Sequence, residues 1–460
     1  MATRQQALTA ARQWFDAGHL LADLRRRVAH RTESQRKDAL PDLRLYLTDE
    51  MGPSLAALGF AWSLVENSVA GAGPFLLASR HESDALPTVL MYGHGDVVLG
   101  YDEQWREGLS PWNLTVDGDR WYGRGTADSK GQHSINVAAL GQVLALRGKL
   151  GFNVKWLIET GEEMGSPGLR VVCEQERAVL AADLFLASDG PRLVAARPTL
   201  FLGSRGAFNF DLTVDLREGG HHSGNWGGLL ANPGTVLANA IAGIVDARGR
   251  ILVDGLRPPP IPPSVRHALA DIEPGEPSGP TIDVDWGEPG LSPAERVFAW
   301  NSIEVLAFKT GNPEHPVNAI PPRAVANLQV RFVVGCDHAN FIPSLRAHLD
   351  RHGFAKVGVA PAAMEIMHAT RLDPEHPWAR RVAASIAQTT GVLPAVLPNF
   401  GGALPNDCFA DILGLPTVWV PHSYPACSQH APNEHMLASV AREGLAMMTG
   451  LFWDLGEAPH

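Results

Sequence analysis

The stretch Thr88-Val-Leu-Met-Tyr-Gly-His94-Gly-Asp96 joins an apolar run to an imidazole and a carboxylate. A short apolar run of this kind is typical of a buried strand, and the polar pair follows where the strand should stop. Two further apolar runs end in the same way, at Glu162-Glu163 and at Asp189. Because parallel sheets bind ligands at the carboxyl ends of their strands, we expect these three tips to converge on one site.

Length and composition indicate a globular protein with more than one domain. The chain has 460 residues, of which 45% are hydrophobic and 19% are charged. A chain of this length exceeds one ordinary hydrophobic core, so we expect two domains. The formal charge of −11 argues against a nucleic-acid partner, because such a partner requires a basic surface.

The sequence predicts neither a membrane protein nor a secreted one. No uninterrupted apolar run reaches the roughly 18 residues that span a bilayer. Residues 1–8 lack the apolar core of a secretion signal. The four cysteines lie far apart without a Cys-x-x-Cys pair, which favours reduced thiols over a disulfide framework. We therefore expect a cytoplasmic protein without a membrane partner.

Strands alternate with helices up to about residue 197 and again after Pro374. The expected elements are helices within 7–59 and at 133–147, 169–180 and 378–389, and strands at 74–80, 87–92, 154–158, 184–187 and 417–420. This alternation is typical of the α/β class, in which helices cover both faces of a mostly parallel central sheet.

The pattern changes near Pro198 to the order β-α-β-β-α-β, which is typical of a ferredoxin-like α+β unit. The expected elements are an extended segment at 201–217, a helix at 233–245, strands at 302–308 and 324–334, a helix at 338–351 and an extended segment at 357–368. We therefore predict a small domain at 198–370 that is inserted into a larger, discontinuous domain formed by 1–197 and 371–460.

The acids and imidazoles at the strand tips indicate a site for two divalent metal ions. His94 is suited to bind one ion while Asp96 orients its ring. Asp128 lies in a glycine-rich loop and is the candidate carboxylate that bridges the two ions. Glu162 and Glu163 would repel each other without a cation, so one can bind an ion while the other acts as a general base. Imidazole together with carboxylate favours zinc, with manganese or cobalt as alternatives.

Five motifs, in this order, resemble the signature of the M20 metallopeptidases, a family of dipeptidases, carboxypeptidases and N-acyl amino acid deacylases. They are His94-Gly-Asp96, Tyr122-Gly-Arg-Gly-Thr-Ala-Asp128-Ser-Lys-Gly131, Glu162-Glu163, Ser188-Asp189-Gly190 and His430-Ala-Pro-Asn-Glu434. The resemblance implies a zinc-peptidase-like catalytic domain and an inserted lid and dimerisation domain.

The resemblance also implies a role for each residue of these motifs. One ion would be bound by His94 and Asp189, and the other by Glu163 and His430. Asp128 would bind both ions and Asp96 would orient His94. Glu162 would be the base that takes a proton from the attacking water.

Further residues of the small domain match the family's lid. In His222-Ser-Gly-Asn-Trp-Gly-Gly228, the resemblance implies that His222 stabilises the oxyanion in the active site of the partner subunit. The neighbouring His221 is the alternative for this role, and the motif alignment favours His222. The resemblance further places Asn318 near the substrate and gives Arg331 the substrate carboxylate.

A glycine-rich loop of the larger domain is expected to contact the same carboxylate. In Gly401-Gly402-Ala403-Leu-Pro405, Ala403 replaces the serine that is usual at this position in the family. The replacement removes a hydroxyl donor, so backbone amides of the loop would take over its contact.

These residues predict hydrolysis of an amide next to a free carboxylate, in a small-molecule peptide or N-acyl amino acid. The chain length and the inserted residues 247–300 resemble those of the family's carnosinase-like dipeptidases, so a dipeptidase or carboxypeptidase is favoured, and an N-acyl amino acid deacylase is the alternative. A non-catalytic relative that only binds a ligand is the alternative from another class. The expected assembly is a homodimer formed through the lid domain.

Overall fold

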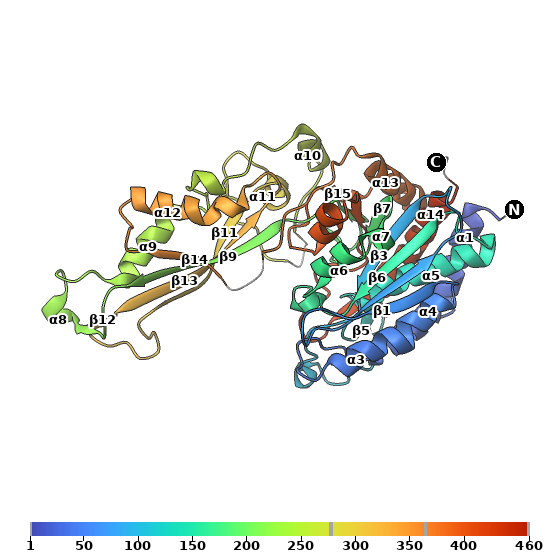
Figure 1. The fold of residues 1–460 in the computed structure, drawn as a ribbon, viewed down its shortest axis with the longest axis horizontal. Helices are drawn as coiled ribbons and strands as arrows, with labels where there is room; N and C mark the ends of the chain where they lie inside the picture. The colour runs from blue at the N-terminus through green and yellow to red at the C-terminus, as the bar shows by residue number, and fades with distance from the viewer. Residues whose placement is uncertain (1, 276–278, 363–365, 458–460) are drawn as a thin grey trace.

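An eight-stranded sheet forms the centre of the larger of two lobes (Figure 1). The computed structural model describes residues 2–275, 279–362 and 366–457. In spatial order the strands of this sheet are β1 (Ala61–Val65), β2 (Phe75–Arg80), β6 (Asn153–Glu159), β3 (Thr88–His94), β7 (Leu184–Ala187), β16 (Thr417–Trp419), β8 (Thr199–Phe201) and β15 (Ala395–Leu397).

The middle of this sheet is parallel, as the sequence predicts. Strands β6, β3, β7 and β16 run in one direction, whereas β1 and β2 pair antiparallel at one edge. Both faces of the parallel part are buried. In β3, Val89 and Met91 belong to one hydrophobic core, and Leu90 and Tyr92 to the other. The apolar run at 88–92 is therefore continuous because the strand is covered on both sides.

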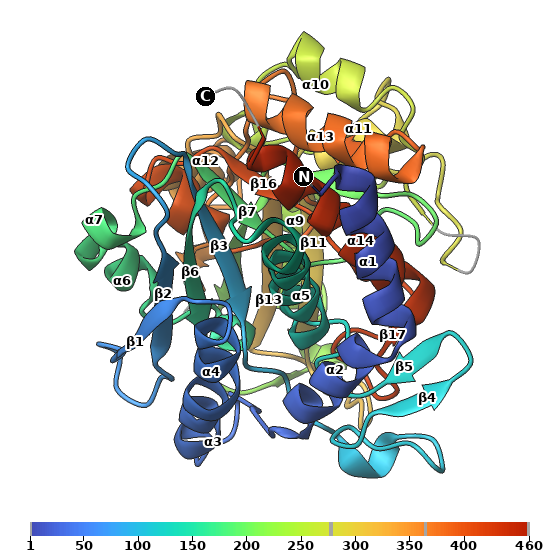
Figure 2. The ribbon, with the colours of Figure 1, turned by 90° about the vertical axis from the view of Figure 1, so that its right-hand side faces the viewer.

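Helices cover both faces of the sheet (Figure 2). The helices on one face are α1 (Arg4–Asp16), α2 (His19–Ala29), α3 (Leu40–Leu45), η1 (Tyr46–Met51), α4 (Gly52–Ala56), α5 (Lys130–Arg147), α13 (Pro377–Thr390) and α14 (Ala438–Leu455). Those on the other face are α6 (Leu169–Gln175), α7 (Arg177–Leu180) and η6 (Cys408–Ile412). The single helix expected at 169–180 is thus divided in two near Glu176.

The smaller lobe is a four-stranded antiparallel sheet with the spatial order β11-β13-β9-β14. Its elements follow one another in the chain as β9 (Gly206–Asp215), α9 (Pro233–Ile244), β11 (Ser302–Thr310), β13 (Arg323–Phe332), α12 (Phe341–Arg351) and β14 (Gly358–Pro361). The first strand therefore lies between the third and the fourth, which is the arrangement of a ferredoxin-like unit and confirms the predicted β-α-β-β-α-β order.

The structure contains two strands where the sequence predicts one continuous extended segment. The expected extended segment at 201–217 is split between β8 in the larger lobe and β9 in the smaller one. Its break contains Gly203, whose φ is 155°, and a Cβ at this position would lie 2.1 Å from the carbonyl oxygen of Thr370. The expected extended segment at 357–368 contains only the short β14, and its residues 363–365 lie outside the described residues.

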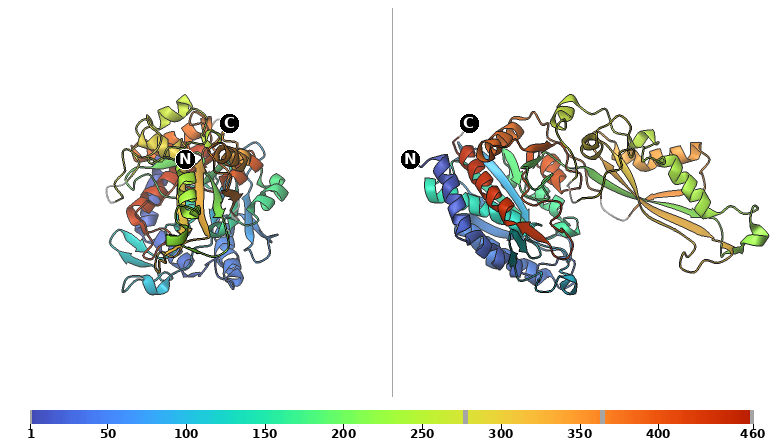
Figure 3. Two further views of the ribbon diagram at one scale, coloured as in Figure 1. Left: turned by 90° about the vertical axis from the view of Figure 1, so that its left-hand side faces the viewer. Right: turned by 180° about the vertical axis from the view of Figure 1, so that it is seen from behind.

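The chain crosses between the lobes at two adjacent places. The Thr370 amide donates to Ser204 O at 3.0 Å, and the Leu372 amide donates to Leu202 O at 2.6 Å. Figure 3 shows the smaller lobe extending away from the larger one, with both termini on the far side of the larger lobe. The boundaries at 197/198 and 370/371 stay predictions.

Part of the range predicted for the small domain packs on the larger lobe. Helices α10 (Pro263–Ala268) and α11 (Pro293–Phe298) contribute Val265 and Phe298 to the same core as Leu397 of β15. Residues 261–275 and 279–299 are together called the bridging segment below, and Figure 1 shows α10 above the junction of the lobes.

Short elements complete the structure. They are η2 (Asp102–Gln104), β4 (Thr115–Asp117), β5 (Arg120–Tyr122), η3 (Glu162–Met164), β10 (His221–His222), α8 (Ser223–Trp226), η4 (Asp254–Leu256), β12 (Ala319–Ile320), η5 (His338–Asn340) and β17 (His435–Leu437). Among the helices of the described ranges, none combines the length and the apolar character that crossing a membrane requires.

Candidate metal centre

Three neighbouring strands bring the polar tips to one edge of the large sheet. His94 is the last residue of β3 and pairs in register with Glu159, the last residue of β6. The short helix η3, which contains Glu162 and Glu163, follows β6, and Asp189 comes two residues after β7. Because β3, β6 and β7 are parallel neighbours, their carboxyl ends meet at one edge, as expected from the sequence.

Five side chains form two overlapping groups at this edge. One group is His94, Asp128 and Asp189, and the other is Asp128, Glu163 and His430, with the ligand atoms of each group within 4.8 Å of one another. Asp128 belongs to both groups. Its Oδ1 lies 2.9 Å from Nε2 of His94, and its Oδ2 lies 2.9 Å from Nε2 of His430.

The spacing of the remaining donor atoms fits a pair of bound cations. Nε2 of His94 lies 3.5 Å from Oδ2 of Asp189, and Nε2 of His430 lies 3.0 Å from Oε2 of Glu163. Ligand atoms about 2.0–2.2 Å from a tetrahedral zinc ion lie roughly 3.3 Å from one another. The four separations of 2.9–3.5 Å are therefore compatible with one shared ion in each group.

Asp96 links the two sides of the centre. Nδ1 of His94 lies 3.1 Å from the Asp96 carbonyl oxygen and 3.4 Å from its carboxylate. The two carboxylate oxygens accept hydrogen bonds from the backbone amides of Glu162 and Glu163, each at 3.1 Å. Asp96 thus orients the imidazole and also fixes the turn that carries both glutamates.

The carboxylates at the centre are buried close to one another. Burial raises the pKa of Glu162 well above its ordinary value; His94 opposes this, and the negative charges of nearby acids add to it. Burial and the charge of Asp128 raise the pKa of Glu163 to about 7. The same two causes raise the pKa of Asp189. Bound cations would relieve this repulsion, which is the condition under which a cluster of ionised acids is stable.

The same acids also raise the pKa of the two imidazoles, and for a histidine a raised pKa favours the charged form. Hydrogen bonds to Asp128 and Glu163 raise the pKa of His430 to about 11. Burial alone would lower the pKa of His94, but its hydrogen bonds to three carboxylates outweigh burial and raise it well above the ordinary range. Without metal, the imidazolium protons supply the positive charge. A metal ligand must be neutral, so binding metal would release these protons.

Glu434 supports the bridging carboxylate, a role that the sequence did not reveal. Its Oε1 accepts hydrogen bonds from the backbone amides of Gly125, Ala127 and Asp128 at 3.0, 2.9 and 3.1 Å. Its Oε2 accepts from Nη1 of buried Arg124 at 2.7 Å. The motif around His430 includes Glu434, but only the folded chain shows that the carboxylate points at the loop of Asp128.

Two glutamines also hold the centre and lacked a sequence signal. Nε2 of Gln132 donates to Ala127 O at 2.9 Å and to Gly190 O at 3.2 Å, which joins the loops of two ligands. Nε2 of Gln429 donates to Oδ2 of Asp128 at 2.5 Å. These hydrogen bonds hold Asp128 and the loops of the candidate ligands in place.

The predicted lid histidine does not lie at the metal centre of its own chain. His222 is exposed in β10, which pairs with β12, and its Nδ1 accepts a hydrogen bond from the Gly224 amide at 3.1 Å. The carbonyl oxygen of Asn318 accepts from the Ser223 amide at 2.9 Å, so Asn318 shares this place. Figure 1 shows α8 and β12 at the tip of the smaller lobe, on the far side from β3, β6 and β7.

Arg331 belongs to the smaller lobe, and Gly402 and Ala403 lie in a loop of the larger lobe between β15 and η6. Arg331 lies in β13, where its Nε donates to Oε1 of Gln329 at 2.8 Å. A second arginine, Arg205, donates from Nε to Gly401 O at 2.9 Å, beside Gly402 and Ala403. Burial and the positive charge of Arg331 lower the pKa of Arg205 to about 10. Two guanidinium groups therefore lie near the glycine-rich loop, and the sequence pointed to only one of them.

Comparison with known proteins agrees with this geometry. The model of peptidase family M20/M25/M40 matches residues 90–454. The chain belongs to the M20/M25/M40 peptidase family. The five motifs, which resemble the M20 signature, therefore lie in a chain that belongs to this family.

Two of the similar proteins are named dipeptidases. The chain is 34% identical to Beta-Ala-His dipeptidase of Mus musculus over 186 residues, which are 40% of this chain and 37% of that enzyme. It is 27% identical to Cysteinylglycine-S-conjugate dipeptidase of Corynebacterium striatum over 329 residues, which are 69% of this chain and 70% of that enzyme. The match to the mouse enzyme thus spans little more than a third of that enzyme's length.

Solved structures share the whole fold. Human carnosine dipeptidase 1 aligns with a TM-score of 0.75 at 22% identity, over 98% of this chain and 99% of that one. An M20 family metallo-carboxypeptidase from Sulfolobus solfataricus aligns with a TM-score of 0.78 at 24% identity, over 95% of this chain and 99% of that one. Both lobes are therefore part of the shared fold, which confirms the predicted α/β class with its inserted antiparallel sheet.

Proposed function

We propose that this M20 protein is a dipeptidase that uses two metal ions to cleave a peptide bond next to a free carboxylate. The observation that carries the proposal is the placement of Asp128, whose two carboxylate oxygens face separate groups of ligand atoms. The relatives named Beta-Ala-His dipeptidase and Cysteinylglycine-S-conjugate dipeptidase support a dipeptide as the substrate.

The donor set fits two divalent ions, and zinc suits it best. Each group offers one imidazole and two carboxylates, a mixture that zinc accepts and that manganese or cobalt also accept. A structural relative from Bacillus subtilis is described as a dinuclear metal-binding peptidase of the family. When bound here, such ions would polarise the scissile carbonyl and lower the pKa of the attacking water.

Glu162 is the general base in this proposal. It belongs to neither ligand group, yet the backbone amide next to its side chain is fixed by Asp96, and burial raises its pKa. A carboxylate with a raised pKa can accept a proton from the attacking water at one oxygen and return it to the leaving amine. Glu163, its neighbour, binds an ion instead.

The remaining roles require a second subunit. His222 would stabilise the developing oxyanion, but it directly precedes α8, which Figure 1 shows at the tip of the smaller lobe, so it would have to reach the centre of a partner subunit. We propose a homodimer formed by the smaller lobes. Strand β11 supports this, because it is an edge strand and exposes Val305, Leu306 and Phe308.

The carboxylate of the substrate would bind at the base of the smaller lobe. Arg331 and Arg205 supply positive charge next to Gly402 and Ala403, and a guanidinium binds a carboxylate through two parallel hydrogen bonds. Ala403 offers no hydroxyl, so the arginines and the backbone amides of the loop would make this contact. Asn318, at the distant tip, would join the site together with the partner's copy of His222.

The experiment that tests this function combines metal analysis with a substrate panel. Purified protein should contain two metal equivalents per chain, lose turnover with a chelator and regain it when zinc, manganese or cobalt is added. The panel sets dipeptides against N-acetyl and N-succinyl amino acids. Preference for the acylated substrates would replace the dipeptidase by a deacylase, and a folded protein without metal or turnover would favour a ligand-binding role.

A further inference from the structure

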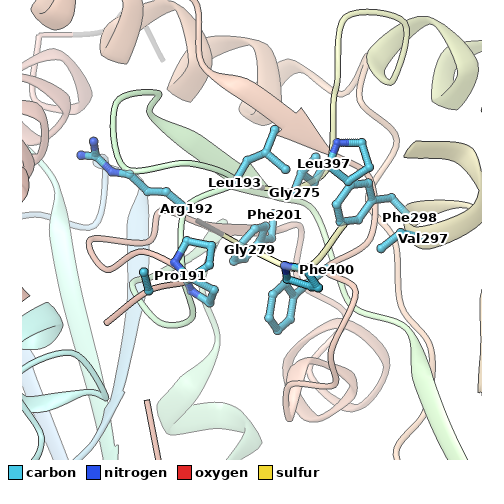
Figure 4. Close-up of a pocket in the computed structure, with 14 residues that line it drawn as sticks. Pro191, Arg192, Leu193, Phe201, Gly275, Gly279, Val297, Phe298, Leu397 and Phe400 are labelled. Carbon is cyan, nitrogen blue, oxygen red and sulfur yellow. The ribbon is translucent and has the colours of Figure 1, made fainter. Parts of the chain in front are cut away.

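An apolar pocket of about 430 Å³ lies between the larger lobe and the bridging segment (Figure 4). Aliphatic and aromatic side chains dominate its wall, and they come from chain segments that are far apart in the sequence. The main ones are Leu193, Phe201, Val297, Phe298, Leu397 and Phe400. A volume of this size is within the range of small-molecule sites and would hold an aromatic side chain.

The pocket has no charge available for a ligand among the described residues that line it. Arg192 is the charged residue on its wall, but Figure 4 shows its guanidinium pointing away from the phenylalanines. Nη1 of Arg192 donates to Oε2 of Glu443 at 2.5 Å and to Ala195 O at 3.1 Å. The charge is therefore already neutralised, and the wall favours a neutral, apolar group.

One wall of the pocket touches the loop of a metal ligand. Gly190 follows Asp189, and a Cβ on Gly190 would lie 3.2 Å from Cε2 of Phe201 and 3.7 Å from Cζ of Phe400. The rings of Phe201 and Phe400 stack with their centroids 4.6 Å apart. The exposed residues Pro425 and Ala426 line the pocket too, and their loop continues to His430.

Phe400 also touches the loop proposed to bind the substrate carboxylate. A Cβ on Gly402 would lie 2.6 Å from Cε1 of Phe400. The pocket thus borders both the loop of Asp189, beside which the scissile carbonyl would be held, and the carboxylate loop. In a dipeptide these two groups flank the α-carbon of the carboxy-terminal residue, so the side chain of that residue is the part nearest to Phe400.

We propose that this pocket binds the side chain of the carboxy-terminal residue of the substrate and selects a large apolar or aromatic one. The inference rests on the proposed dipeptidase function, and it names the substrate class within it. The reason is the hydrophobic effect: an aromatic side chain would leave water and contact three phenylalanines, whereas a methyl group would leave most of the pocket unfilled.

The test compares Ala-Phe, Phe-Ala and Ala-Ala on the metal-loaded enzyme. We expect kcat/KM for Ala-Phe to exceed that for Ala-Ala by roughly 10- to 100-fold, the range that apolar pockets discriminate. Phe-Ala should gain no such advantage. L-Phenylalanine should also inhibit at lower concentration than L-alanine, which measures the pocket without turnover of a peptide.

A variant that partly fills the pocket provides a second test. Val297→Phe adds a ring to the wall from α11 without leaving a cavity, and the ratio of kcat/KM for Ala-Phe to that for Ala-Ala should fall about tenfold. Ile282→Phe is the matched control, because Ile282 is an exposed residue of the same bridging segment outside this wall. Its ratio should equal that of the wild type.

The outcomes separate this inference from the function on which it rests. Equal turnover of Ala-Phe and Ala-Ala, or an unchanged ratio in Val297→Phe, overturns the pocket assignment and leaves the dipeptidase intact. A preference for Phe-Ala over Ala-Phe overturns the assignment to the carboxy-terminal residue. Failure to cleave any dipeptide with metal bound overturns both proposals.

Discussion

The two adjacent glutamates of η3, the short helix after β6, have different surroundings, and this difference supports the different roles proposed for them. Glu163 reaches Nε2 of His430 at 3.0 Å and belongs to a ligand group, whereas Glu162 belongs to neither group. Their backbone amides bind the same carboxylate, that of Asp96. A single anchor therefore fits the proposed division, in which Glu163 binds metal and Glu162 transfers the proton.

Glu162→Gln should abolish catalysis and preserve metal binding. The amide has the shape of the carboxylate but cannot accept a proton, so kcat should fall by roughly 10²- to 10⁴-fold. Elemental analysis should still find two metals per chain. Glu163→Gln is the matched control, and it should lose metal as well as turnover. Wild-type kcat in Glu162→Gln would remove this residue from the role of base.

Glu434→Gln should weaken metal binding although residue 434 is not a ligand. The new amide group would leave either Arg124 or the three backbone amides without their acceptor, and the loop of Asp128 would lose its support. We expect metal affinity to fall about 10- to 100-fold, as measured by competition with a chromogenic chelator. Glu66→Gln, which removes an exposed ion pair with Arg44, should bind metal normally. Normal affinity in Glu434→Gln would contradict the supporting role.

At the scale of elements, the strands and their tips could be predicted, but the breaks between elements could not. The run at 88–92 is apolar on both faces, so a buried strand ending at His94 follows from pattern alone. The division of 201–217 into β8 and β9 depends on the contact of Gly203 with Thr370, which lie 167 positions apart by their residue numbers. No local pattern carries that information.

The same distinction applies to the candidate site. The five candidate ligands and Glu162 could be predicted because they follow strands or lie in motifs. Arg205, Gln132 and Glu434 act through partners that are distant in sequence, so only the folded chain reveals them. Likewise, no pattern indicated that the bridging segment packs on the larger lobe.

Gly203→Ala should destabilise the junction between the lobes. Its Cβ would lie 2.1 Å from the carbonyl oxygen of Thr370, so the two crossings would have to separate. We expect a loss of about 1–3 kcal/mol in the free energy of unfolding, measured with urea. Gly243→Ala is the control: its Cβ would lie 3.7 Å from Phe354 in open contact, and alanine should stabilise α9 by about 0.5–1 kcal/mol. Unchanged stability of Gly203→Ala would show that the crossings can separate freely.

At the scale of the whole molecule, the proposed catalytic groups lie in different lobes of one chain. The candidate ligands and Glu162 follow strands of the larger lobe or lie in its loops, and His222 directly precedes α8, which lies at the tip of the smaller lobe (Figure 1). A homodimer in which each tip reaches the centre of the other subunit would bring them together. The proposed active site thus combines residues of two chains.

Mixing two inactive variants tests this arrangement. His222→Ala and Glu162→Gln should each have little turnover, and subunits exchanged in equal amounts should recover about a quarter of wild-type activity. Half of the dimers would then be mixed, and each of these would have one site with both residues intact. The two variants measured before exchange are the controls. If His222 instead acted within its own chain, exchange would restore nothing.

The position of His222 has one further consequence, for how the enzyme would respond to dilution. If each active site needs His222 from the other subunit, the number of active sites follows the fraction of chains that are paired. Turnover per milligram should therefore decline once the protein concentration falls below the dissociation constant of the dimer, although every metal ion is still bound. The concentration of the protein would then itself regulate the activity of each chain.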